Sequence, residues 1–278
     1  MLKGMLREFP KCYWIWNHRR WCLEDLSKDH IADWKYELGL VLKVLEMDSR
    51  NFHGWHYRRY VVWSIERELL EAQGDAKKLQ MSSLKLYLAE YVYATSKIKK
   101  NISNFSAWHS RSKLIPKIMI LTSGVNDMGD LGEYAETVQL FKSPLKLLNY
   151  ELDLVKTGMF MDAADTSVWL FMRWLLTDDI FVNELKKSSG DTYLQILEQQ
   201  LSNVTELNEL EKEDSPLQHD NVGCVKMIVF IRALINKQRE KALLDKEVIE
   251  SLNLLTELDP LRKGHYLDQI NGLSPLTC

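Results

Sequence analysis

One short phrase recurs four times in this chain of 278 residues: a Trp followed three or four positions later by an Arg. The copies lie near residues 10–22, 49–62, 102–115 and 163–176, with the pairs Trp16 and Arg19, Trp55 and Arg58, Trp108 and Arg111, and Trp169 and Arg173. The four Trp are 39, 53 and 61 residues apart, which fits a repeating pair of helices joined by loops of growing length. Repeats of this kind stack on their neighbours, so we predict a single helical solenoid domain over residues 1–278.

Each phrase opens a predicted helix and follows another amphipathic helix. Residues 33–47 carry apolar side chains close to the 3.6-residue period, and the break at 48–51 supplies a helix cap. The same pattern returns over 84–98 and over 145–155, where Pro144 suits a helix start. No stretch alternates with period two for long enough to be a strand, so we predict an all-α fold of helical hairpins.

Several segments are expected to depart from the regular repeat. The Gly- and Asp-rich segment 123–132 and the acidic segment 203–221 are predicted to be inserted loops. A degenerate fifth unit without its Trp is expected near 220–235. Residues 257–270 are predicted to end one helix, start another at a Pro and form a terminal cap.

Composition and charge limit the function classes. With 46% hydrophobic residues, 27% charged residues and apolar runs too short to cross a bilayer, we expect a soluble protein without an integral membrane segment. Residues 1–115 hold 20 Lys and Arg against 13 Asp and Glu, whereas residues 116–278 hold 16 against 26, so the basic half either faces an anionic partner or is an uneven solvated surface. No basic cluster is large enough to predict nucleic-acid binding.

Cysteine usage gives a further expectation about the compartment. Cys12, Cys22, Cys224 and Cys278 are few and irregularly spaced, and no segment typical of a secretory signal opens the sequence. We therefore expect no disulfide framework and a cytoplasmic location.

The residues of the phrase have a structural use of their own. A Trp and an Arg three or four positions later share one helical face, so the indole can fill the gap between helices while the guanidinium reaches an acid or an aromatic ring. A Trp stripe at helical spacing is usually core. His53 and His56 have metal-ligand spacing, but His18, His56 and His109 each closely follow a repeat Trp, so no metal site is expected. Since no phosphate loop or nucleophile motif occurs either, the residues by themselves describe a scaffold.

The phrases nevertheless resemble the repeats of protein prenyltransferase α subunits. The segments Pro10–Arg20 and Arg50–Arg59 carry the similarity, and it continues through all four copies to the terminal segment 259–268, nearly the whole chain. This resemblance implies a right-handed, crescent-shaped superhelix of hairpins that wraps around a barrel-shaped β subunit. That partner would hold the catalytic zinc and the isoprenoid pocket, so no cofactor is expected in this chain.

The resemblance also implies three site residues. Lys11 matches a Lys that approaches the isoprenoid diphosphate, Tyr13 matches the neighbouring aromatic residue, and His53 matches a second residue near the lipid substrate. Because diphosphate leaves as the prenyl group is transferred, a cation at this position would stabilise charge that grows in the transition state. We therefore expect Lys11 to be catalytic without covalent chemistry, whereas Tyr13 and His53 either contact the substrate or simply pack a repeat edge.

Within the family, the resemblance is greatest to the Rab class, also called type II, in its compact fungal form. Trp14 stands where farnesyltransferase α subunits carry a Gln that reads a CaaX carboxylate, and Phe52 replaces a Tyr. The expected reaction transfers geranylgeranyl from geranylgeranyl diphosphate to C-terminal cysteines of Rab GTPases presented by a Rab escort protein.

Two alternatives stay open at this point. The chain could be the α subunit shared by farnesyltransferase and type I geranylgeranyltransferase, or a helical-repeat adaptor without an enzymatic partner. The resemblance also implies a further repeat before Pro10, where only nine residues stand, so we expect a chain shortened at its N terminus.

Overall fold

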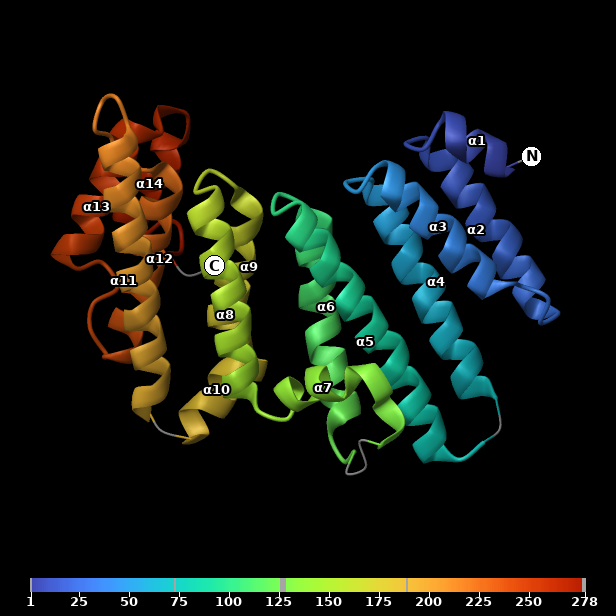
Figure 1. Cartoon of the computed structure of the whole chain (residues 1–278). Coiled ribbons are helices and arrows are strands. Elements are labelled where there is room, and N and C mark those ends of the chain that lie inside the picture. The colour runs from blue at the N-terminus through green and yellow to red at the C-terminus, as the bar shows by residue number, and fades with distance from the viewer. Residues whose placement is uncertain (1, 73, 126–128, 189, 277–278) are drawn as a thin grey trace. The chain divides into compact units, whose positions relative to one another are not determined.

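Helices account for every regular element in the described part of the chain (Figure 1). The computed structural model describes all residues except 1, 73, 126–128, 189, 277 and 278. The helices group into two compact units, residues 1–142 and residues 143–278. The prediction of an all-α fold is thus confirmed, and the prediction that both units form one repeat domain stays a prediction.

The first unit is built from pairs of consecutive helices. Its elements are α1 (Leu2–Glu8), α2 (Tyr13–Lys28), α3 (Trp34–Met47), α4 (Phe52–Glu71), α5 (Ala76–Lys100), α6 (Phe105–Thr122), the 3₁₀ helix η1 (Gly129–Tyr134) and α7 (Ala135–Phe141). Within the pairs, α3 packs on α4 and α5 on α6. The helices that carry the Trp phrases, α2, α4 and α6, also contact one another in order. A layer of phrase-bearing helices therefore runs through this unit.

Side-chain caps explain where several of these helices begin. Asp33 caps α3, and Asn51 and Asn104 cap α4 and α6 by accepting from the backbone N–H three residues on. The predicted boundaries of the helix over 33–47 and of the break at 48–51 are confirmed. The helix predicted over 84–98 is longer, because α5 already begins after the cap Asp75.

The second unit repeats the pattern with one short extra helix. Its elements are α8 (Pro144–Met161), α9 (Thr166–Thr177), α10 (Asp179–Ser188), α11 (Gly190–Asp214), α12 (Val222–Gln238), α13 (Lys246–Leu258), η2 (Pro260–Arg262) and α14 (Lys263–Ile270). Pro144 lies in the first turn of α8, as predicted, although this helix continues beyond the predicted range of 145–155. Asn221 caps α12 where the degenerate unit was expected, and η2 with α14 forms the expected terminal element.

The prediction of a loop over residues 203–221 is wrong for most of that segment. α11 continues through Asp214, and Val204 and Leu207 on it are only 0% and 3% exposed. An apolar face at helical spacing thus outweighs the acidic composition, because the acidic side chains stay solvated on the opposite face. In the other predicted loop, 123–132, the last residues form η1, and residues 126–128 lie outside the described residues.

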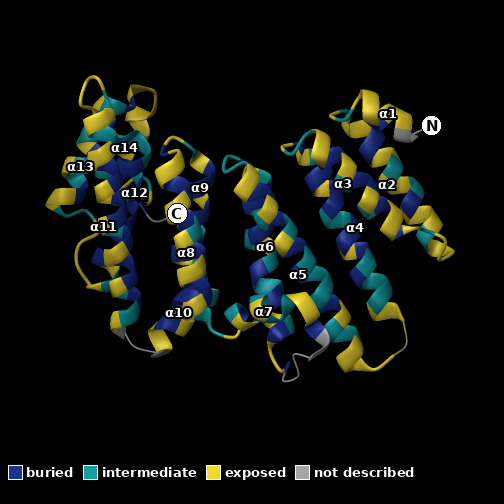
Figure 2. Ribbon diagram, in the orientation of Figure 1, coloured by how far each residue is buried: buried dark blue, intermediate teal, exposed yellow. Residues whose placement is uncertain are grey.

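Burial follows the helix faces that meet within each unit (Figure 2). None of the helices in the described ranges is both long and apolar enough to cross a membrane. The thiols of Cys12, Cys22 and Cys224 are free, and Cys278 lies outside the described residues.

Candidate functional site

Each of the four repeat Trp residues is buried, and its indole N–H forms a hydrogen bond with the turn that precedes its helix. The exposed fraction of the four indoles lies between 1% and 7%. Their Nε1–H groups donate to the carbonyl six residues earlier, at 2.8 Å for Trp16 to Pro10, 2.8 Å for Trp55 to Ser49, 2.7 Å for Trp108 to Ile102 and 2.9 Å for Trp169 to Ala163. A buried indole needs an acceptor, so this bond fixes the turn that precedes each phrase.

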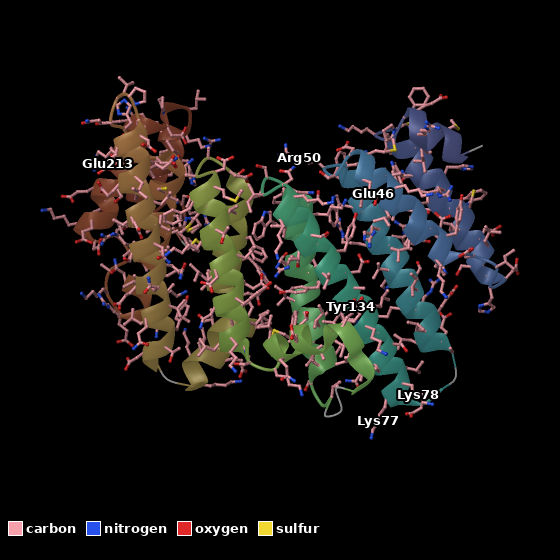
Figure 3. All side chains as sticks on the ribbon, in the orientation of Figure 1. Glu46, Arg50, Lys77, Lys78, Tyr134 and Glu213 are labelled. Carbon is pink, nitrogen blue, oxygen red and sulfur yellow. The ribbon has the colours of Figure 1, made fainter. Side chains whose placement is uncertain are left out.

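The capping Asn residues tie one turn to the next. Asn51 Nδ2 donates to the Pro10 carbonyl at 3.0 Å, and Asn104 Nδ2 donates to the Ser49 carbonyl at 2.8 Å. The Oδ1 atoms of the same two side chains cap α4 and α6, so each side-chain amide forms hydrogen bonds through both its nitrogen and its oxygen. Arg50, labelled in Figure 3, adds a weaker link of 3.4 Å from Nη2 to Asn101 Oδ1. Successive turns of the first unit are therefore held in register.

The first two repeat Arg residues pair with buried acids. Arg19 donates to both carboxylate oxygens of Glu37 at 2.7 and 2.5 Å, and Tyr57 donates to the same carboxylate at 2.5 Å. Burial acts to lower the pKa of Arg19, but the contacts with Glu37 outweigh it and raise that pKa. Arg58 and Glu90 form a second two-bond pair, at 2.7 Å for each bond.

The later repeat Arg residues lie against aromatic rings. Arg111 is fully buried, donates to Thr95 Oγ1 at 2.5 Å and to the Tyr91 hydroxyl at 2.6 Å, and lies 4.0 Å from the Tyr91 ring. Arg173 lies 4.4 Å from the ring of Phe230. The contacts of Arg111 belong to the interior of the hairpin of α5 and α6, whereas Arg173 is partly buried and lines a hollow of the second unit.

Lys11, in contrast, is an exposed cation at the entrance to α2. Its side chain is 72% exposed, and Nζ lies 3.3 Å from Asp48 Oδ2 at the end of α3. An ammonium group has three N–H donors, so this single contact leaves Lys11 able to bind an anionic ligand.

His53 lies beside Lys11 at the start of α4. Its imidazole lies near enough to the Lys11 backbone for that backbone to act on its pKa, and its ring centroid lies 4.0 Å from that of Phe52. Burial lowers the pKa of His53, and the nearby Lys11 backbone opposes this shift only in part. Tyr13, the first residue of α2, is 47% exposed and its ring lies 4.6 Å from Trp14. The structure thus brings Lys11 and His53 together and places Tyr13 at the adjoining helix start.

An open hollow adjoins this site between α4 and α6. Its volume is about 450 Å³, and its lining consists of Phe52, His53, His56, Arg59, Phe105, Ser106 and His109. Arg59 Nη1 donates to Ser110 Oγ at 3.2 Å. Burial lowers the pKa of Arg59. The hollow therefore combines a guanidinium, imidazoles and aromatic rings.

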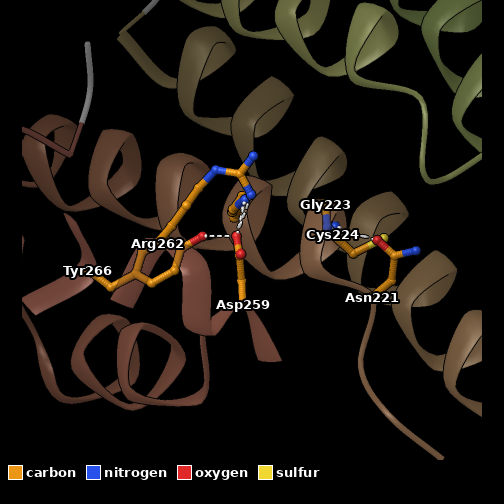
Figure 4. A network of polar contacts seen from close by, with 7 residues as sticks. Asn221, Gly223, Cys224, Asp259, Arg262 and Tyr266 are labelled. Atoms are coloured by element: carbon orange, nitrogen blue, oxygen red, sulfur yellow. Dashed lines mark hydrogen bonds and ion pairs between the residues drawn. The ribbon is translucent and has the colours of Figure 1, made fainter. Parts of the chain in front are cut away.

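A larger hollow of about 630 Å³ lies in the second unit, near the starts of α9 and α12. Two of its cations share one carboxylate: Lys226 and Arg262 approach Asp259 Oδ2 at 2.8 and 2.9 Å, and Tyr266 donates to the same atom at 2.6 Å (Figure 4). These contacts, the bond from Lys226 first, lower the pKa of Asp259 far below its usual range. Asp259 thus joins α12 to the terminal cap.

Sequence reasoning missed several of these residues. The carbonyl partner of each Trp lies within its own phrase, but nothing in the sequence marks it as an acceptor. The acceptors of the Asn amides and the acids Glu37 and Glu90 lie in other turns or helices, so the phrase does not reveal them. The sequence shows Arg59 only as part of the second phrase and does not reveal its surroundings. Among the residues that the structure describes, no three His, Cys, Asp or Glu side chains meet as a metal site requires.

Comparison with known proteins identifies relatives of this arrangement. The model of the protein prenyltransferase alpha subunit repeat matches residues 1–26, 34–65 and 87–118, which contain the first three phrases. The chain is 48% identical over 279 residues to the geranylgeranyl transferase type-2 subunit alpha of Candida albicans, covering 98% of this chain and 71% of that protein. For the protein of the same name from Saccharomyces cerevisiae, the identity is 34% over 263 residues, 95% of this chain and 69% of that protein. For the human protein of that name it is 35% over 175 residues, 63% of this chain and 25% of that protein.

Proposed function

Since the chain belongs to the protein prenyltransferase α-subunit repeat family, we propose that it serves as the α subunit of a type-2 geranylgeranyl transferase. With a zinc-bearing β subunit, it transfers geranylgeranyl groups from geranylgeranyl diphosphate to C-terminal cysteines of Rab GTPases presented by an escort protein in the cytoplasm. The zinc and the isoprenoid pocket belong to the β subunit. When bound there, the zinc activates the acceptor thiol as a thiolate nucleophile.

The observation that carries this proposal is the pairing of Lys11 with His53 at adjoining helix starts. Lys11 contributes an exposed ammonium group with N–H donors left over from its contact with Asp48. His53 lies beside the Lys11 backbone, and Asn51 Nδ2, which donates to the Pro10 carbonyl at 3.0 Å, holds the turn that presents this ammonium group. The leaving diphosphate gains negative charge as the bond to the prenyl carbon breaks. A fixed cation at this position lowers the barrier, because its attraction is greater for the transition state than for the bound substrate.

A Lys11→Ala substitution tests this role in the assembled enzyme. We expect the single-turnover rate of prenyl transfer to fall by about 10- to 100-fold, while association with the β subunit changes little. Lys78→Ala is the matched control, because Lys78 is another exposed Lys of the first unit, at the start of α5 (Figure 3). An unchanged single-turnover rate for Lys11→Ala would remove Lys11 from the site.

Co-expression with barrel subunits tests the substrate class. We expect a stable complex with a type-2 β subunit and transfer to an escort-bound Rab GTPase, with none to a CaaX peptide. Transfer to the CaaX peptide would instead identify the α subunit shared by farnesyltransferase and the type I enzyme. Failure to form a complex with either kind of β subunit would identify a helical-repeat adaptor.

A further inference from the structure

Arg59 is a partly buried cation without an acidic partner. It forms no ion pair with any Asp or Glu among the residues for which the structure gives positions, and its hydrogen bond is the one to Ser110 Oγ. Burial lowers its pKa, and no carboxylate of the described residues forms an ion pair that would offset this cost. Withdrawing a guanidinium from water without a counter-ion is unfavourable unless an anion arrives from elsewhere.

Other cations of the chain can be compared with Arg59, beginning with the equivalent Arg of the first repeat. Arg20 stands at the same position of the first phrase, four residues after its Trp, and it donates to Glu24 Oε1 at 2.7 Å. The Lys226 and Arg262 cations of the second unit share Asp259. Arg59 thus lacks the internal carboxylate that Arg20, Lys226 and Arg262 have, although Arg20 and Arg262 are more exposed than Arg59.

The other titratable groups around Arg59 supply no negative charge to balance it. His53, His56 and His109 line the same hollow, and burial first, then the charge of Arg59, lowers the pKa of His56 and of His109. Beyond the hollow, Arg20 and Lys113 act in the same direction on these imidazoles. Every titratable side chain that lines the hollow is basic, so the hollow is complementary to an anion.

The rim of the hollow favours a protein carboxylate over a small phosphate ligand. Phe52 and Phe105, at the first positions of α4 and α6, are 63% and 51% exposed and flank the hollow. Tyr13 and Trp14 at the start of α2 are also exposed. Aromatic rings around a desolvated Arg are typical of the energetic centre of a protein interface.

We propose that the Arg59 hollow receives an acidic side chain of the β subunit, whose carboxylate pairs with the Arg59 guanidinium. This inference rests on the proposed function, which supplies a β subunit as the partner. The carboxylate would take up the donors that Arg59 leaves unused, and Phe52 and Phe105 would exclude water from the pair.

Two measurements on Arg59→Gln test the proposal, with Arg20→Gln as the matched control. The dissociation constant of the complex with a type-2 β subunit is measured at low and at high salt. We expect Arg59→Gln to weaken the complex by at least about 10-fold and to reduce its salt dependence, and Arg20→Gln to change it by less than about 3-fold. In the isolated chain, Arg59→Gln should not lower the melting temperature, since no internal ion pair is lost.

The possible outcomes separate the proposal from its alternatives. Equal affinity of wild type and Arg59→Gln for the β subunit would overturn the docking proposal and leave the proposed function standing. If Arg59→Gln left association unchanged but weakened the binding of inorganic pyrophosphate to the assembled enzyme, the hollow would serve the substrate and the docking proposal would be wrong. A lower melting temperature of the isolated variant, with unchanged affinity, would give Arg59 a structural role. A wild-type chain that binds no type-2 β subunit would overturn the proposed function and the docking proposal together.

Discussion

The buried pair of Arg58 and Glu90 allows a prediction whose size follows from the structure. Both side chains are almost fully buried, at 6% and 8% exposure, and two bonds of 2.7 Å join them across α4 and α5. The guanidinium carbon also lies 3.6 Å from the centre of the Tyr93 ring, and Nη1 finds no hydrogen-bond acceptor among the residues that the structure describes. Arg58 therefore depends on Glu90 for charge compensation.

Glu90→Gln keeps the volume of this side chain and removes its charge. Leaving a buried ion without its partner costs about 3–5 kcal/mol, and the amide oxygen of Gln recovers about 1 kcal/mol as a neutral acceptor. We expect a loss of about 2–4 kcal/mol in the free energy of unfolding, measured by urea denaturation with far-UV circular dichroism. Glu71→Gln is the control, because Glu71 lies 3.7 Å from Arg67 on the surface and should cost less than about 0.5 kcal/mol.

A double variant distinguishes charge from packing. Arg58→Met combined with Glu90→Leu removes both charges and retains apolar volume, so its stability should lie closer to wild type than that of Glu90→Gln. The reasoning is refuted if Glu90→Gln costs no more than Glu71→Gln. It is also refuted if the double variant is at least as unstable as the single one, since the loss would then come from packing rather than from an isolated charge.

Two further predictions concern the links between turns and the terminal cap. Asn51→Ser keeps a capping hydroxyl but loses the amide donor to Pro10, so it should slow prenyl transfer several-fold. Asn104→Ser should lower the free energy of unfolding by a similar amount, about 0.5–1.5 kcal/mol, without slowing transfer. Equal transfer rates for the two variants would show that the link from Asn51 to Pro10 does not support the site. Because the pKa of Asp259 is lowered in the folded state, its carboxylate stabilises the fold at pH values above the usual carboxyl pKa of about 4, and this stabilisation is lost as the pH falls through the lowered pKa. The loss in the free energy of unfolding caused by Asp259→Asn, measured by urea denaturation, should therefore shrink from pH 7 towards pH 2. A deficit that does not change with pH would assign the effect to packing.

The helix starts could be predicted because their causes are local. An Asn or Asp before an apolar period fixes a cap within three residues, and the structure has such caps at Asp33, Asn51 and Asn104. Helix ends depend on neighbours that the sequence does not reveal. The buried Leu207 keeps α11 helical through a stretch whose acidic composition is typical of a loop.

The candidate site could be predicted only in part, because its residues meet through distant links. Lys11 and His53 were named from a family resemblance, but nothing in the local sequence indicates that they adjoin. The link is the bond from Asn51 to the carbonyl of Pro10, across 41 residues. The lack of an acidic partner for Arg59 could not be predicted from the sequence either, because it depends on the positions of Asp and Glu side chains in the folded chain.

One long-range regularity was nevertheless present in the sequence. Glu37, Glu90 and Glu151 each stand 18 residues before the Trp of the following phrase, and all three are buried. The interval stays constant although the phrases themselves are 39, 53 and 61 residues apart, so the added residues fall between a phrase and the next Glu. A hairpin that preserves the distance from a buried acid to a buried indole has a fixed register, because both groups must face the same interior. At the corresponding position before the degenerate unit stands Leu207, 18 residues before Val225, which replaces the Trp. The one unit without the Trp thus also lacks the acid, so from the second phrase onward the two residues occur together or not at all.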